Sequence, residues 1–368
     1  MKRILLLAVF GSVAWAQLTP QETKANLESF EVVWRTVRDR HPDPKLNGLN
    51  WQAVHDEVLP KVAAAKSMSE VRGALTSMLD RLGASHYAVI PGSRYKAAEA
   101  VAEPAVATAV SETAVETKPV SRAAEPEKTA TAAAEAAPAT VEARAETQAE
   151  PQPKGKLVTF GNLPEQRIYF ESRRLPGGSG YIHFNEFLDP VSIMPQVEAA
   201  MKEFAKAPGI VLDLRGNPGG IGIMAMGIAG FFVSKEGQKL GEMKMRDMTL
   251  KFVIYPRGEV YAGPLAILVD GGSASTSEIL AQGLRDLGRA RIFGTRTAGA
   301  ALPSDIVRLP NGDGFQYAQA SYISEKGKVL EGAGVDPDEE VRETREALSA
   351  GRDVVAEAAE KWIIGLRL

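Results

Sequence analysis

Residues 265–280 read LAILVDGGSASTSEIL. The first five residues are all apolar, which predicts a strand buried on both faces of a sheet. Two glycines and several small hydroxyl residues follow, and a helical pattern begins at about Ser275. A serine there lies at a helix N-terminus, where unpaired N–H groups and the helix dipole favour developing negative charge. On spacing alone, the simpler interpretation is that these serines only cap the helix.

Strands and helices alternate on both sides of this stretch, from about Leu157 onward. Apolar runs at 180–184 and 210–214 predict buried strands. The segments 191–206 and 219–233 predict helices, and the end of the chain from 344 to 362 is again helical in pattern. Apolar strands with helical crossovers imply an α/β fold with a parallel sheet covered on both faces.

The N-terminal part has a different pattern, which is helical from Thr19 to His86. The sequences TPQE at 19–22 and SMSE at 67–70 are typical of capping boxes at helix starts. Apolar residues recur at spacings of three and four after each of them, and Gly83 ends the last stripe. We therefore expect three short packed helices, which form a helical cap domain over residues 17–94.

Ala, Glu, Pro and Thr dominate the segment between the two patterned parts. Residues 95–156 contain few large apolar side chains, so they cannot bury enough surface to offset the cost of ordering the chain. This composition predicts a disordered linker between the helical cap domain and a core domain over residues 157–368.

The first sixteen residues resemble a cleavable signal peptide. Lys2 and Arg3 supply a positive start, residues 4–15 a short apolar stretch, and Ala14-Trp15-Ala16 a cleavage site with small residues at the two positions that matter. The apolar stretch is much shorter than the roughly 20 residues that a membrane span needs. We expect cleavage after Ala16, no membrane span afterwards, and a periplasmic or secreted protein.

Composition excludes several classes of function. The 368 residues carry a formal net charge of −3, which gives nucleic-acid binding no electrostatic support. There is no cysteine, and therefore no thiolate nucleophile, redox pair or thiolate metal site. None of the four histidines stands in a metal-ligand spacing. We expect neither a cofactor nor a metal; the sequence gives no oligomeric state.

The segment GSASTSEIL at 272–280 resembles the nucleophile segment of the carboxyl-terminal processing (tail-specific) proteases, a family that includes the tricorn core protease. The resemblance implies a crotonase/ClpP-like sheet core, with Ser275 as nucleophile and the Thr276 N–H as one oxyanion donor. The turn DLRGNPGG at 213–220 resembles a second family motif, which implies Gly219, with Gly220 close behind, as the other donor. Losing one such donor typically slows an enzyme by about 100- to 1000-fold.

The sequence departs from most bacterial members of this family at the general base. The lysine that these members use falls at Ala300, within GTRTAGAA at 294–301. The adjacent Ser85-His86 pair resembles the tricorn branch instead, in which histidine is the base and serine orients it. By this resemblance His86 is the base, Ser85 its partner, and Glu331 the carboxylate that holds the serine.

Together these features predict a serine endopeptidase that cleaves protein or peptide substrates through an acyl-enzyme on Ser275. The family commonly carries a PDZ domain where residues 95–156 lie, and this composition cannot fold as one. By analogy, substrate is expected to lie extended and to add a strand to a sheet edge. One alternative is an inactive relative that binds peptides or apolar ligands; another is a scaffold that presents other exported proteins through residues 95–156.

Overall fold

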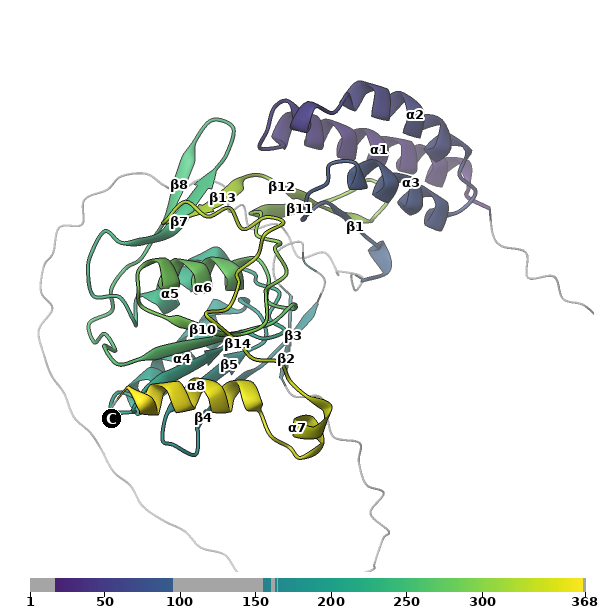
Figure 1. Ribbon diagram of the computed structural model, residues 1–368. Helices are drawn as coiled ribbons and strands as arrows, with labels where there is room; N and C mark the ends of the chain where they lie inside the picture. The colour runs from purple at the N-terminus through teal and green to yellow at the C-terminus, as the bar shows by residue number, and fades with distance from the viewer. Residues whose placement is uncertain (1–16, 95–154, 160–162, 164, 367–368) are drawn as a thin grey trace, which may run out of the picture. The chain divides into compact units, whose positions relative to one another are not determined.

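The computed structural model describes residues 17–94, 155–159, 163 and 165–366, which all belong to one compact unit (Figure 1). The signal peptide predicted for residues 1–16 lies outside the described residues, and so does nearly all of the linker predicted for 95–156. The division of the described unit into a helical cap domain and a core domain stays a prediction.

A six-stranded sheet forms the centre of the fold, in the order β14-β10-β9-β6-β5-β4. Its strands are β4 (Phe170–Arg174), β5 (Gly180–Phe184), β6 (Ile210–Asp213), β9 (Leu265–Val269), β10 (Arg291–Gly294) and β14 (Glu339–Glu340). All neighbouring pairs are parallel except β4 and β5, which are antiparallel. The predicted α/β fold is confirmed, with one antiparallel edge strand added to the parallel sheet.

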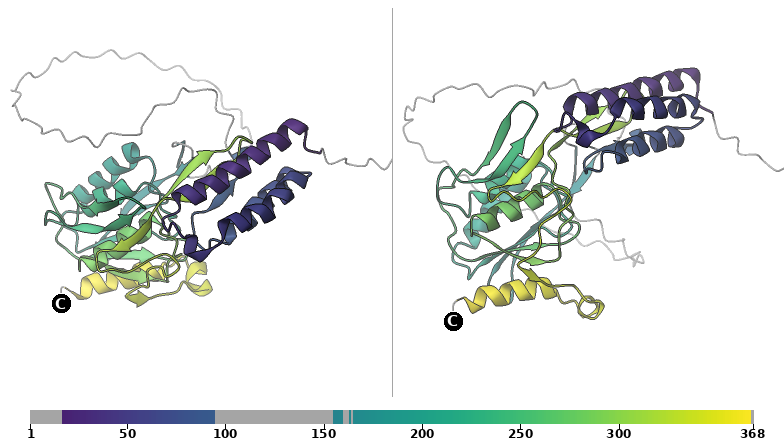
Figure 2. Two further views of the ribbon diagram at one scale, coloured as in Figure 1. Left: turned by 90° about the horizontal axis from the view of Figure 1, so that it is seen from above. Right: turned by 45° about the horizontal axis from the view of Figure 1, so that its top comes forward.

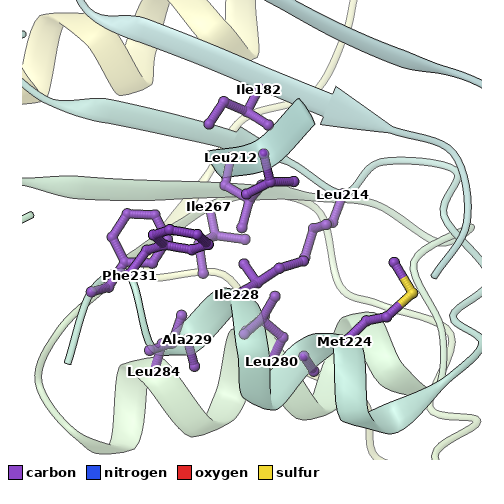
Figure 3. Close-up of a cluster of buried hydrophobic side chains, with 14 of the residues drawn as sticks. Ile182, Leu212, Leu214, Met224, Ile228, Ala229, Phe231, Ile267, Leu280 and Leu284 are labelled. Atoms are coloured by element: carbon purple, nitrogen blue, oxygen red, sulfur yellow. The ribbon is translucent and has the colours of Figure 1, made fainter. Parts of the chain in front are cut away.

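Helices cover both faces of this sheet because its strands present apolar side chains to both sides. Figure 3 shows the hydrophobic core on one face of the sheet, where Ile182, Leu212 and Ile267 face helices α5 (Gly222–Ala229) and α6 (Thr276–Asp286). Helix α4 (Pro190–Glu203) buries residues in this same core. The alternate strand residues, among them Val211 and Leu268, pack against α8 (Val354–Gly365) on the opposite face.

The N-terminal helices are α1 (Pro20–Arg40), α2 (Trp51–Ala64) and α3 (Met68–Asp80), which lie side by side in Figure 2. The predicted capping box is present, since Thr19 accepts a hydrogen bond from the Glu22 N–H and Glu22 accepts one from the Thr19 N–H. Trp34 and Trp51 each donate an indole N–H to the other's backbone carbonyl, at 3.0 Å. These two bonds join α1 to α2 inside a buried core.

The helices pack on a three-stranded sheet of order β1-β12-β11. Its strands are β1 (Ala88–Ile90), β11 (Ser304–Arg308) and β12 (Gly314–Ala318). Phe315 and Tyr317 of β12 belong to the same buried core as the helices. In addition, Arg72 on α3 makes a two-pronged ion pair with the buried Asp313, at 2.8 and 2.9 Å. Segments far apart in the chain therefore share one core here.

The remaining elements are short. A second three-stranded sheet has the order β13-β7-β8, and β2 pairs with β3. Their bounds are β2 (Lys156–Val158), β3 (Gln166–Ile168), β7 (Lys239–Lys244), β8 (Thr249–Val253) and β13 (Ser321–Ser324), and the other short elements are η1 (Leu46–Gly48), η2 (Gly92–Arg94) and α7 (Arg345–Ser349).

Two predicted helices differ from the structure. The helix predicted over 219–233 is shorter, because Gly219 and Gly220 have φ of 101° and 135° and so form a turn before α5 begins. The helical pattern predicted over 344–362 is divided into α7 and α8, because Asp353 caps a new helix with its side chain.

Candidate active site

Ser275 is the N-cap of α6, and the turn 270–274 joins it to the end of β9. Its backbone is strained, with φ of 52° and ψ of −115°, a conformation that residues with a side chain seldom adopt. The Ser275 N–H is held by the carbonyl of Ala300 at 2.8 Å and by the Glu278 carboxylate at 3.0 Å. The strand–helix junction thus fixes the serine in one backbone orientation.

Glu278 is a fully buried carboxylate that organises the chain around Ser275. It accepts hydrogen bonds from the N–H groups of Gly299 and Ala300, at 2.9 and 3.0 Å, and from the hydroxyl of Thr297 at 2.5 Å. The loop that bears Ala300 is therefore tied to the start of α6. Ala300, which stands at the family's lysine position, lies beside Ser275 and offers only a methyl group.

The glycine-rich turn after β6 is held against the same serine. Asn217 is buried; its amide donates to the Phe184 carbonyl at 2.8 Å and its oxygen accepts from the Gly219 N–H at 2.9 Å. A Cβ atom on Gly219 would come within 2.8 Å of Ser275 Cβ and of the Thr276 nitrogen. Only glycine permits this close approach.

Two backbone N–H groups beside Ser275 are free to receive an anion. The Gly219 N–H is already bound to Asn217. Among the described residues, by contrast, no hydrogen bond uses the N–H of Gly220 or of Thr276, and both residues line the same cavity as Ser275. Of the two glycines that the sequence suggested, Gly220 is the one whose donor is available.

Ser85, His86 and Glu331 form a hydrogen-bonded relay. The Ser85 hydroxyl donates to Glu331 Oε2 at 2.9 Å and lies 2.7 Å from His86 Nδ1. Because a hydroxyl has one proton, which here goes to Glu331, the bond with Nδ1 requires a proton on that nitrogen. His86 Nε2 is then left unprotonated, which is the state that a general base needs.

Backbone groups hold the carboxylate of this relay. Glu331 accepts hydrogen bonds from the N–H of Ser85 at 2.6 Å and of Ala301 at 3.1 Å. Burial lowers the pKa of His86 below its ordinary value of 6.5, and the negative charge of Glu331 opposes this shift. The imidazole is therefore mainly neutral near pH 7.

His86 of this relay lines one cavity of about 620 Å³ together with Gly220, Ser275 and Thr276. It lies beyond the carboxyl ends of β5, β6 and β9, the usual place for a binding site in an open α/β sheet. The residues that line this cavity include His86, Glu186, Gly219, Gly220, Ser275, Thr276 and the segment 303–306, which leads into β11.

Other polar residues of the segments GSASTSEIL, DLRGNPGG and GTRTAGAA have structural contacts. Ser273 and Ser277 are buried, and their hydroxyls donate to the carbonyls of Leu214 and Asn217. Arg215 joins the buried Asp213 to Asp353 at the start of α8. Arg296 donates to the carbonyl of Ala333 and is largely exposed.

Asn217 and Glu278 are the site residues whose importance the sequence did not reveal. In the sequence, Asn217 is one residue of the motif DLRGNPGG, and Glu278 stands in the first turn of a helix, where a carboxylate is common. The signal that could have found Glu278 is its place three residues after a candidate nucleophile, although burial and partners decide what it does.

In the part of the chain that the structure describes, no helix is long and apolar enough to cross a membrane. Across the same described residues, no group of three or more His, Asp or Glu side chains is arranged so that it could hold a metal ion.

Comparisons with known proteins give matches in both parts of the chain. Residues 178–341 match Peptidase family S41, and residues 23–80 match the Tricorn protease C1 domain. A carboxy-terminal-processing protease of Bartonella bacilliformis is 30% identical over 199 residues, which are 51% of this chain and 44% of that protein. This chain thus matches less than half the length of that relative.

Two solved structures share the fold across most of the chain. A lipoprotein from Streptococcus agalactiae superposes with a TM-score of 0.58 at 16% identity, covering 95% of this chain and 98% of that one. The photosystem II D1 C-terminal processing protease gives 0.51 at 18% identity, covering 88% and 94%. At these identities the likeness shows the fold alone.

Proposed function

We propose that this chain is an exported serine endopeptidase with Ser275 as nucleophile and His86 as general base. Its residues 178–341 match Peptidase family S41, in agreement with the sequence resemblance. The observation that carries this proposal is the relay from Glu331 through Ser85 to His86, which opens on the cavity that contains Ser275. The family's lysine position is Ala300, and none of the described residues that line the cavity is a lysine.

The proposed reaction is acyl transfer in two halves. His86 Nε2 takes the proton from the Ser275 hydroxyl as its oxygen bonds to the carbonyl carbon of the peptide. The N–H groups of Gly220 and Thr276 stabilise the oxyanion. The C–N bond then breaks, and the leaving amine receives the proton from His86. In the second half, His86 deprotonates a water that attacks the Ser275 ester, and the serine regains its proton.

Strand β11 supports the proposal that substrate binds in an extended form. It is the end strand of the described sheet β1-β12-β11 and pairs there with β12. Residues 303–306, at the start of this strand, line the cavity that contains Ser275. A peptide that adds a strand to this edge gains backbone hydrogen bonds while its side chains enter the cavity.

Export and domain order complete the proposal. Residues 1–16 serve as a cleaved signal peptide, and residues 95–156 link a helical cap domain to the core domain. Since His86 comes from the first part and Ser275 from the second, activity requires that both parts are folded together. Sequencing the N-terminus of the protein recovered from a Gram-negative host tests the cleavage after Ala16.

The function is tested on residues 17–368 with unfolded casein and a fluorophosphonate that labels reactive serines. The wild type is expected to cleave and to label, whereas Ser275→Ala and His86→Ala do neither. The matched control is Ser349→Ala, an exposed serine of α7 outside the cavity, which should keep both activities.

Full activity in His86→Ala would exclude the histidine mechanism. A folded wild type that neither cleaves nor labels would favour the binding-protein alternative.

A further inference from the structure

The charged side chains that line the cavity around Ser275 are acidic. Of its described lining residues, Glu186 and Asp305 are carboxylates, and none is lysine or arginine. His86 is the remaining titratable group, and burial keeps it mainly neutral near pH 7. An acidic cavity without a cation attracts positive groups and disfavours a substrate carboxylate.

Glu186 occupies a position that the backbone fixes firmly. It follows β5 and stands between Asn185 and Phe187. Asn185 accepts a hydrogen bond from the Tyr169 N–H at 2.8 Å, and Phe187 donates its N–H to the Gly219 carbonyl at 2.8 Å. Because Gly219 packs on Ser275, Glu186 belongs to the segment that directly supports the nucleophile.

The carboxylate of Glu186 lacks a protein partner. It is half-buried, and no hydrogen bond or ion pair among the described residues reaches it. Burial raises the pKa of Glu186, as expected for a carboxylate that has lost water without gaining a donor. A polar group in this state points to a ligand that would supply the missing donor.

The walls around this carboxylate are apolar. Leu188, Ile221, Phe252 and Ile279 line the same cavity. Lysine and arginine are the side chains that combine a long aliphatic stem with a cationic end, so they match both features at once.

We propose that Glu186 is a specificity-determining residue that binds the side chain of a substrate lysine or arginine near the scissile bond. This inference rests on the proposed peptidase function and names the substrate class of that site. The cation donates to the Glu186 carboxylate while its stem lies on the apolar walls.

Asp305 is the other carboxylate of the cavity, and it is less suited than Glu186 to bind a cationic side chain. It is exposed on β11, and its side chain already accepts the Ile306 N–H at 2.7 Å. Charges in contact with solvent are screened by salt, whereas half-buried ones are screened less. Asp305→Asn is therefore the matched control for Glu186→Gln.

The test uses fluorogenic peptides in which lysine is placed at each position in turn, each paired with a norleucine peptide that keeps most of the stem and lacks the charge. At the best position, kcat/KM should favour lysine by about tenfold or more, the size of one charge-assisted hydrogen bond. Glu186→Gln should remove most of this preference, Asp305→Asn should keep it, and Glu186→Lys should favour glutamate instead.

Binding measured without catalysis separates this inference from the proposed function. Fluorescence anisotropy with Ser275→Ala should show the same lysine preference, and the added Glu186→Gln change should abolish it. Equal binding of the two peptides, or a preference that survives Glu186→Gln, would overturn the role of Glu186. If the preference holds but the wild type fails to label with a fluorophosphonate, the proposed peptidase function is wrong, and the role of Glu186 in binding a lysine or arginine side chain stands.

Discussion

The hydroxyl of Ser85 donates a hydrogen bond of 2.9 Å to Glu331, which lies 246 residues further along the chain. Replacing Glu331 with Gln removes the negative charge that stabilises a protonated His86. The expected result is a fall in kcat of about 100-fold, within the usual range for general-base catalysis. Steady-state hydrolysis of a fluorogenic peptide measures it. Asp336→Asn, an exposed carboxylate in the same loop, is the control and should leave kcat unchanged.

The pH dependence of kcat/KM should report His86. The neutral imidazole is the active form, so the rate rises as the pH increases through the His86 pKa. Because burial lowers this pKa, the plateau should begin at a lower pH than for a histidine with the ordinary value of 6.5. Glu331 raises the pKa, so Glu331→Gln should move the acidic limb to still lower pH. A limb that stays in place would argue against His86 as the titrating group.

Gly219→Ala should inactivate the site through contact with the nucleophile. The added Cβ would lie 2.8 Å from Ser275 Cβ and from the Thr276 nitrogen, and the φ of 101° is strained for alanine. We expect kcat to fall by about 100-fold or more, as on loss of an oxyanion donor. Gly216→Ala provides the comparison, since its φ is 67° but its Cβ would meet nothing within 4 Å. It should cost about 1 kcal/mol of stability and leave kcat intact.

Glu278→Gln should affect both stability and reactivity. An amide NH₂ in place of one carboxylate oxygen would face N–H donors from Ser275, Gly299 or Ala300. The free energy of unfolding should fall by about 2 kcal/mol, and fluorophosphonate labelling of Ser275 should slow. Urea unfolding and labelling rates check the two effects separately. The exposed Glu236→Gln should change stability by less than about 0.5 kcal/mol.

The ion pair between Arg72 and the buried Asp313 should contribute more to the free energy of unfolding than an exposed ion pair does. Arg72→Met leaves the buried Asp313 charge without its cation, which should cost about 3 kcal/mol. Arg81→Met breaks the exposed pair with Glu57 and should cost less than about 1 kcal/mol. Urea unfolding distinguishes the two. Equal effects would mean that Asp313 finds another partner once Arg72 is gone.

The sequence predicts the central sheet well because its strands are buried on both faces. Strands β5 and β9 have the predicted bounds, Gly180–Phe184 and Leu265–Val269. The predicted helix at 219–233 was too long for a related reason. Phe231, Phe232 and Val233 are buried in the same core although they follow the helix, so their apolar character records burial rather than helical structure.

Some residues of the candidate site could be predicted from the sequence, and others could not. Ser275, His86 and Glu331 were named from family motifs, and the structure brings them to one cavity and its relay. Glu186 and Glu278 could not be recognised, because an acidic residue in a sequence carries no sign of its burial. The Glu278 carboxylate accepts hydrogen bonds from four donors, whereas the Glu186 carboxylate accepts none from the described residues. Segments far apart in the chain create that difference.

The relay between Ser85 and Glu331 also sets an order of events during synthesis. A ribosome makes Ser85 and His86 early and Ser275 much later, and it reaches Glu331 only 246 residues after Ser85. Until then the nascent chain holds a nucleophile and a base without the group that orients them. If the proposed mechanism holds, the chain gains its power to cut proteins only after Glu331 has been made. Its own unfinished segments, and those of neighbouring nascent chains, are protected until that moment.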